Sequence, residues 1–112
     1  MVKTIKIGNK DVKLNANAAT PILYRAKFNR DLMQDLYGMV DEPVAYETYG
    51  MVAYIMAMDA GEEVPEDYVE WLRGFDGLLD LVEALDEIMD VWERSKVTTV
   101  KAKKKSGPQS ES

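Results

Sequence analysis

The segment from Asp76 to about Ser95 constrains the fold most, because its apolar residues recur at steps of three and four. This spacing is close to the 3.6-residue period of an α-helix and predicts an amphipathic helix with Asp76 as its N-terminal cap. The recurring side chains are Leu78, Leu81, Val82, Leu85, Ile88, Met89 and Trp92. Such a helix is stable only when its apolar face packs against other elements, so the chain must build a core around it.

A second helix is predicted from Pro43 to about Asp59, with Asp41 as its cap and Gly61 after its end. Its apolar residues surround the helix axis and few charges interrupt them. They are Tyr46, Tyr49, Met51, Val52, Tyr54, Ile55, Met56 and Met58. An apolar surface nearly all round indicates burial on several sides. Two interpretations stay open: the central helix of a small bundle, or part of an oligomer contact.

Two further helices are predicted from turn and cap residues. Thr20 as N-cap and Pro21 at the first position favour a helix over Ile22–Tyr37, which Gly38 would end. Its residues near one face are Ile22, Ala26, Met33 and Tyr37. A short helix is expected after Pro65 and before the breaks at Gly74 and Gly77. It carries Tyr68, Val69, Trp71 and Leu72.

The N-terminal residues predict a β-hairpin, with strands around 2–7 and 12–14 and turn residues at 8–11. A lone hairpin is marginal in water, so it must pack on helices or pair with another chain's edge. Residues 96–112 are rich in Lys and poor in apolar side chains, and we expect them to be disordered. The predicted fold class is α+β, mainly α: one domain over 1–95, with a hairpin, three or four packed helices and a disordered tail.

Composition excludes several kinds of site. The chain has no Cys and no His, which excludes disulfides, Cys/His zinc sites and histidine-based triads. No glycine-rich nucleotide loop is present, and no cofactor is expected. The longest apolar run, 51–58, is far shorter than the about 20 residues of a membrane span. The N-terminus lacks the features of a signal peptide, so we expect a cytoplasmic protein.

Charge is distributed unevenly along the chain, whose net charge is −6. Residues 1–30 carry seven basic side chains and one acidic, whereas residues 31–95 carry two basic and eighteen acidic. The tail is basic again. The acidic balance argues against a protein whose whole surface binds nucleic acid, and the asymmetry bears on partners and solubility rather than on fold.

The acidic residues of the 76–95 helix line one stripe, because they follow each other at steps of four and three. They are Asp76, Asp80, Glu83, Glu87 and Asp90. Three interpretations are open: a solvated face, a docking strip for a basic or amphipathic partner helix, or a carboxylate site for a metal or acid–base chemistry. Hard cations need ligands that converge from several directions, and these diverge along one helix, which disfavours the third. The Met- and Tyr-rich helix is likewise either ordinary core or a hydrophobic groove.

The layout and two phrases of the chain resemble a known family. The Lys-rich hairpin is followed by NANAATPILYRAKFNRDL at 15–32, then by an acidic helical body with LDEIMDVWE at 85–93, and then by a Lys-rich tail. Together they resemble the small tail assembly chaperones of siphophages and prophages of Gram-positive bacteria. The similarity extends over nearly the whole chain, and its motifs are not catalytic signatures.

The resemblance implies a non-enzymatic role in phage tail assembly. Members of the family bind the long, helical tape measure protein, keep it soluble, help to recruit tail tube subunits and are absent from the finished virion. Many are made in two lengths through a ribosomal frameshift, and the Lys103–Lys105 run is where A-rich slippery codons would lie. We therefore expect a homo-oligomeric chaperone of the host cytoplasm, whose longer form reaches the tail tube protein.

The partner-binding residues predicted from the sequence fall into two groups. Apolar anchors are Tyr49, Met56, Trp71 and Trp92, and electrostatic guides are Asp80, Glu83, Glu87 and Asp90. One alternative function is a small nucleic-acid-interacting regulator that uses the basic head and tail. A second is a small carboxylate-dependent hydrolase, which a bound divalent ion or a carboxyl with a strongly raised pKa would favour.

Overall fold

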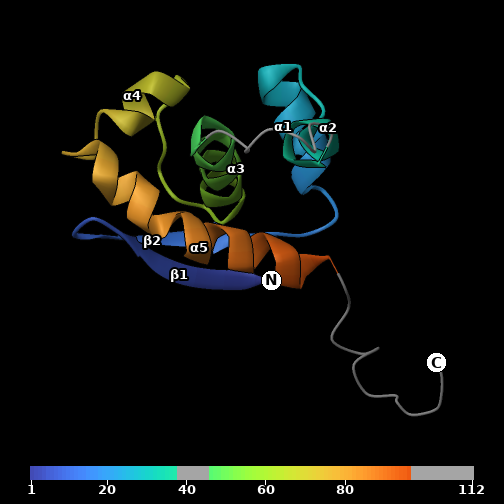
Figure 1. Ribbon diagram of the computed structural model, residues 1–112. Coiled ribbons are helices and arrows are strands. Elements are labelled where there is room, and N and C mark those ends of the chain that lie inside the picture. The colour runs from blue at the N-terminus through green and yellow to red at the C-terminus, as the bar shows by residue number, and fades with distance from the viewer. Residues whose placement is uncertain (38–45, 97–112) are drawn as a thin grey trace, which may run out of the picture.

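The computed structural model describes residues 1–37 and 46–96 (Figure 1). Within them an N-terminal hairpin precedes five helices, which confirms the expected α+β, mainly helical class. The elements are β1 (Val2–Ile7), β2 (Lys10–Asn15), α1 (Thr20–Phe28), α2 (Leu32–Tyr37), α3 (Tyr46–Asp59), α4 (Tyr68–Leu72) and α5 (Leu78–Ser95). The expected cap at Asp41, the Gly38 terminator and the tail beyond Lys96 lie outside the described residues.

The hairpin is antiparallel, with Val2 opposite Asn15 and Ile7 opposite Lys10. Its turn is shorter than expected, since only residues 8–9 separate the strands. Gly8 has a φ of 65°, a conformation that glycine adopts readily and other residues rarely do. The alternation of the strands buries one face and leaves the other in solvent. The buried side chains are Ile5, Ile7, Val12 and Leu14.

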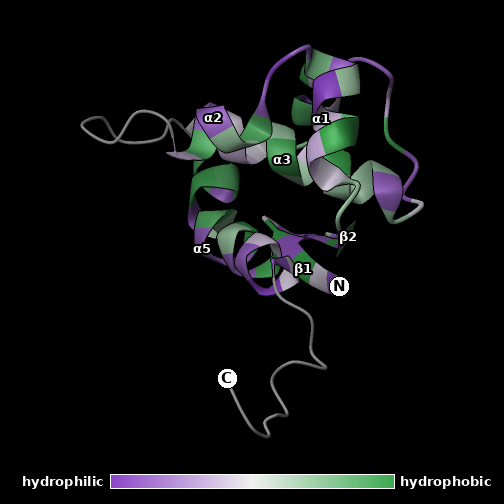
Figure 2. Ribbon diagram, turned by 90° about the vertical axis from the view of Figure 1, so that its right-hand side faces the viewer, coloured by the Kyte–Doolittle hydropathy of each residue, from purple (hydrophilic) through white to green (hydrophobic). Residues whose placement is uncertain are grey.

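In the view of Figure 1, the hairpin lies below α3. Helices α1 and α2 lie on one side of α3, and α4 lies on the other. Helix α5 lies along β1 and also contacts α3, while α3 contacts β2 and α1. The buried hydrophobic residues of these elements form one core cluster. Figure 2 colours the ribbon by hydropathy and shows hydrophobic segments in green on α3, α5 and the hairpin. The hairpin therefore packs on helices of its own chain, one of the two arrangements expected from the sequence.

Helix α3 is the centre of the core. Every residue from Met51 to Ala57 is buried, so all sides of the helix are covered within one chain. This agrees with the interpretation of this segment as a central helix. Gly50 lets two neighbours approach α3 closely: a Cβ at this position would contact the Tyr68 hydroxyl and would lie 3.2 Å from a Leu81 methyl group.

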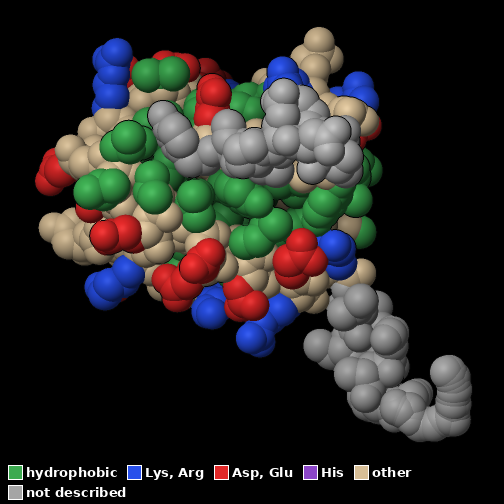
Figure 3. All heavy atoms as spheres, in the orientation of Figure 1, with side chains coloured by type: hydrophobic (Ala, Val, Ile, Leu, Met, Phe, Trp, Pro, Cys, Tyr) green, Lys and Arg blue, Asp and Glu red, His purple; other side chains and the backbone are tan. Residues whose placement is uncertain are grey.

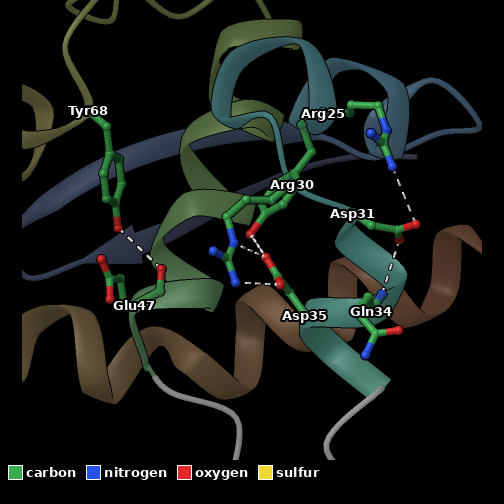
Figure 4. Close-up of polar contacts among 8 residues, drawn as sticks. Arg25, Arg30, Asp31, Gln34, Asp35, Glu47 and Tyr68 are labelled. Atoms are coloured by element: carbon green, nitrogen blue, oxygen red, sulfur yellow. Dashed lines mark hydrogen bonds and ion pairs between the residues drawn. The ribbon is translucent and has the colours of Figure 1, made fainter.

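The single helix expected over Ile22–Tyr37 is wrong, because the chain breaks it into α1 and α2. Asn29 lies between them in the left-handed region, with a φ of 57°, and its N–H donates to the Arg25 carbonyl oxygen at 2.7 Å. Asn tolerates this conformation better than most residues. Arg30 then folds back onto the Asp35 carboxylate through two hydrogen bonds of 2.7 and 2.8 Å (Figure 4).

The side chains that face the core also differ from the expected ones. The four residues placed on one face of the expected helix, Ile22, Ala26, Met33 and Tyr37, are all exposed. The buried residues of α1 and α2 are instead Thr20, Tyr24, Leu32 and Leu36. Thr20 is not the cap either. It lies in the first turn, after Ala19, and its buried hydroxyl accepts a hydrogen bond from the Asn17 N–H at 3.0 Å.

The remaining two helices agree with the sequence, apart from the start of α4 and the cap of α5. Helix α4 begins at Tyr68, after Asp67 and not at Pro65 as expected, and α5 ends at Ser95. The cap of α5 is Gly77 rather than Asp76, and its N–H donates to the Asp80 carboxylate at 3.4 Å. Gly77 has extended backbone angles and its Cα faces open space, so the start of α5 carries no side chain.

Candidate partner-binding surface

Three of the four predicted apolar anchors belong to the core. Met56 is fully buried in α3, while Trp71 and Trp92 are more than nine-tenths buried. The Trp92 Nε1–H donates to the Tyr37 hydroxyl at 2.9 Å. These three side chains stabilise the fold and offer little surface to a partner in this conformation. Tyr49 is half-buried, and its role as an anchor stays a prediction.

Tyr49 borders a small apolar recess between α2, α3 and α5. The recess is lined by Leu36, Tyr49, Val52, Ile88, Met89 and Trp92. At its edge the Tyr37 hydroxyl donates to Glu93 at 3.1 Å and accepts from Lys96 at 3.2 Å. The Lys96 ammonium lowers the pKa of Glu93, and Glu93 raises the pKa of Lys96. Burial raises the pKa of Tyr49, so its phenol stays protonated at neutral pH.

The predicted acidic guides divide into two pairs. Asp80 lies against the hairpin turn, where a Cβ on Gly8 would come within 2.7 Å of its Oδ2. Asp90 pairs with Arg94 at 3.0 Å and with Lys3 at 3.8 Å. From Asp80 to Asp90 the helix rises about 15 Å, and from Lys3 to Gly8 the hairpin extends about 17 Å. These similar lengths let both carboxylates lie along the hairpin. Asp90 therefore links α5 to β1 through Lys3, and Asp80 packs close to the hairpin turn.

Glu83 and Glu87 lie between them and are exposed. Among the described residues neither has a hydrogen bond or an ion pair with another side chain. Of the four predicted electrostatic guides, these two stay open to a partner.

The opposite flank of α5 exposes apolar side chains that the sequence analysis assigned to the core. Leu78 is 58 % exposed, and Val82, one turn further along, is 36 % exposed. The neighbouring Leu79 is 66 % exposed. Figure 3 shows hydrophobic side chains in a band along α5, with acidic and basic side chains on the side below it. Large exposed aliphatic groups at the start of one helix are typical of an interaction surface.

A groove between α4 and α5 continues this flank. Its volume is about 180 Å³, and its lining residues are Leu72, Phe75, Gly77, Leu78 and Leu81. We call it the α4–α5 groove. Sequence reasoning missed it, although the signal was present: the apolar residues at 78, 79, 81 and 82 make a stripe wider than one buried face requires.

An aromatic network positions α4 beside the groove. Trp71 meets the rings of Tyr54 and Phe75 with centroid distances of 5.5 and 5.0 Å. Tyr68 in turn contacts Phe28 at 5.5 Å, and its hydroxyl donates to the Glu47 carbonyl oxygen at 3.3 Å (Figure 4). Edge-to-face pairs of this kind stabilise by about 0.5–1.5 kcal/mol each beyond their burial. They fix a helix of five residues that is too short to be stable alone.

Most basic residues of the head are already paired with carboxylates. Lys6 contacts Asp11 at 2.9 Å, and Lys3 contacts Asp90. Arg25 and Arg30 pair with Asp31 and Asp35 at 3.6 and 2.7 Å (Figure 4). Within residues 1–30, this pairing reduces the open positive charge that a nucleic-acid interface would require.

Within residues 1–37 and 46–96, no group of three or more acidic side chains converges to hold a metal ion. None of the helices in these ranges combines the length and apolar character needed to cross a bilayer. Comparisons with protein-family models, curated proteins and solved structures found no match to this chain.

Proposed function

We propose that this protein is a phage tail assembly chaperone that binds the tape measure protein stoichiometrically and keeps it soluble until the tail tube forms around it. The observation that carries the proposal is the exposed apolar flank of α5, which includes Leu78 and Val82 and continues into the α4–α5 groove. A long amphipathic helix aggregates when its apolar face is exposed, and this flank offers that face a complementary surface. Glu83 and Glu87 lie on the same helix, where they would attract basic residues of the partner.

The proposal extends to the assembly steps that follow from the resemblance. A longer frameshifted form recruits tail tube subunits, the chain acts as a homo-oligomer in the host cytoplasm, and it leaves before the virion is complete. A slippery heptamer at the codons for Lys103–Lys105 and an overlapping downstream reading frame would support the longer form. A neighbouring gene for a very long helical protein would identify the partner.

Co-expression with that tape measure protein tests the proposed function. We expect the partner to move from the insoluble to the soluble fraction and to be captured with the tagged chain. Leu78→Asp places a charge on the apolar flank and should abolish most of the capture. Charge reversal of Glu83 and Glu87 to Lys should reduce it less, because exposed charges contribute only about 0.2–1 kcal/mol each.

Ile22→Asp is the matched control, since it changes an aliphatic side chain of similar exposure on α1. It should leave capture at the wild-type level. A tape measure protein that stays insoluble beside the wild-type chain would overturn the proposed function. Equal capture by the Leu78→Asp and wild-type chains would remove this flank of α5 from the binding surface.

A further inference from the structure

A second recess shares the lining residue Phe75 with the α4–α5 groove. It has a volume of about 240 Å³ and is formed by β2, the connection after α3, and α4 with the loop that follows it. Its aromatic wall consists of Trp71 and Phe75. The acidic side chains around it are Asp11, Glu62, Glu63 and Glu70, and its one lysine is Lys10. We call it the acidic recess.

The carboxylates of the acidic recess are not equally available. Asp11 is paired with Lys6, and Glu70 is paired with Arg73, both at 2.9 Å. Glu62 accepts a hydrogen bond from the Lys13 backbone N–H at 2.8 Å and has no cationic partner in the described part of the chain. Glu63 is exposed and has no partner at all among residues 1–37 and 46–96. The recess therefore has open negative charge beside aromatic rings.

The groove and the recess each fit one side chain rather than a small molecule. Both are smaller than the roughly 300–1,000 Å³ of typical ligand pockets. Phe75 lines both, so the groove and the recess are adjacent. An apolar site and an acidic site side by side are complementary to two neighbouring side chains of one amphipathic helix, one aliphatic and one basic.

We propose that Phe75 lines both halves of a two-part docking site, in which the α4–α5 groove takes a large aliphatic side chain and the acidic recess takes an arginine or lysine from the same partner helix. The inference rests on the proposed function only for the identity of that helix, a segment of the tape measure protein. Arginine fits best, because its guanidinium stacks on aromatic rings and pairs with carboxylates. The site selects basic amphipathic helices over acidic ones.

The position of Lys10 shows that the aromatic wall of the acidic recess can bind a cation. Its Nζ lies 5.5 Å from the centre of the Phe75 ring, the arrangement of a cation–π contact. A basic side chain of the partner would meet the same ring from within the recess, and Lys10 would then compete with it and repel it. Removing the charge of Lys10 should therefore strengthen binding, whereas removing the charge of Glu63 should weaken it.

A fluorescent helical peptide of about 18 residues, or five turns, with Leu and Arg on one face, provides the probe. Its affinity is measured by anisotropy against the full chain. Replacing the Arg residues of the probe by Gln should weaken binding by at least about tenfold, and added salt should weaken the Arg probe more than the Gln probe. Equal affinity for the two peptides would overturn the acidic half of the site.

Variants of the protein locate the two halves. Gly77→Leu should reduce affinity by about tenfold or more, because its side chain enters the open space of the groove, and Gly77→Ser should reduce it less. Glu63→Gln should weaken the Arg probe by about threefold, and Lys10→Gln should strengthen it by a similar factor. Asp86→Asn, an exposed carboxylate on α5 that lines neither cavity, should have no effect.

The results distinguish the docking site from the proposed function. The expected pattern together with failure to capture the tape measure protein would keep the docking site and overturn its assigned partner. Capture of the tape measure protein that Gly77→Leu, Glu63→Gln and Lys10→Gln all leave unchanged would overturn the docking site and leave the chaperone role standing. Thermal unfolding of each variant checks that the fold is intact. If Gly77→Leu does not fold, Glu63→Gln and Lys10→Gln test the docking site in its place.

Discussion

Helices α3 and α5 both carry long apolar patterns, yet the structure uses them in opposite ways. Most apolar residues of α3 are buried in the core, and its middle turns from Met51 to Ala57 have no exposed side chain. Helix α5 buries one face, exposes apolar residues on one flank and presents carboxylates on the other. An apolar surface all round a helix therefore marks the centre of this fold, and an apolar stripe that is too wide marks its binding surface.

The energies involved explain this division. Burying a Leu side chain fully is worth about 1.5–3 kcal/mol, so Leu78 and Leu79 leave a large stabilisation unused in the single chain. A partner that covers them gains it. The side chains from Met51 to Ala57 in α3 have no such reserve, because they are already buried. Substitutions in α3 should therefore affect folding, and substitutions on the open flank of α5 should affect association.

The largest effect on stability is expected from Met56→Ala in α3. This change removes a fully buried side chain and leaves a cavity, which should lower the free energy of unfolding by about 3 kcal/mol. Urea denaturation followed by circular dichroism measures it. Met56→Leu conserves the volume and should cost less than about 1.5 kcal/mol. If Met56→Ala instead left stability unchanged and abolished partner capture, Met56 would be a surface anchor, as the sequence indicated.

A smaller effect is expected at the polar contact that ties α1 to α2. The Asp35 side chain is only 8 % exposed, and it accepts hydrogen bonds from Arg30 and from the Tyr24 hydroxyl at 2.7 Å. Asp35→Asn should lower the free energy of unfolding by about 1.5 kcal/mol at neutral pH, the range of a hydrogen bond to a charged group. The matched change Asp31→Asn, at a more exposed carboxylate with a longer ion pair, should cost less.

The same contact predicts a pH dependence. The hydrogen bond from Arg30 lowers the pKa of Asp35 below its value in the unfolded chain, against the opposing effect of burial. A lowered folded-state pKa stabilises the protein above the unfolded-state value of about 3.9, and the contribution is lost as the pH falls through the folded-state value. The stability difference between wild type and Asp35→Asn should therefore shrink between pH 5 and strongly acidic pH. A constant difference over that range would contradict the assignment.

The fold was largely predictable from local patterns, and the failures came from contacts distant in sequence. The alternation of strands and the helical period predicted the hairpin, α3, α4 and α5. The break at Asn29 has no Gly or Pro to signal it, and it depends on Arg30 reaching Asp35, which pattern reasoning does not see. Thr20 and Tyr24 share one face of α1, and the sequence interpretation chose the opposite face, that of Ile22 and Ala26.

The candidate site was less predictable than the fold. The periodicity of α5 identified Leu78 and Val82 as apolar-face residues but not as exposed ones, because exposure depends on where α4 ends. The acidic strip was visible, but the contacts of Asp90 with Lys3 and of Asp80 with the Gly8 turn span most of the chain. Three segments that are separate in the sequence form the acidic recess, so no local sequence pattern predicts it.

The smallest effect on stability is expected from Leu78→Ser on the open flank of α5. The side chain is already mostly exposed, so the free energy of unfolding should change by less than about 0.5 kcal/mol. Its effect on association should be large, because the partner loses the aliphatic contact at the groove. Urea unfolding and peptide affinity are measured in parallel for this variant and for Met56→Ala. Leu78→Ser should reduce mainly affinity, and Met56→Ala should reduce mainly stability. A loss of stability as large as that of Met56→Ala would mean that Leu78 packs as a core residue and that α5 has no free apolar flank.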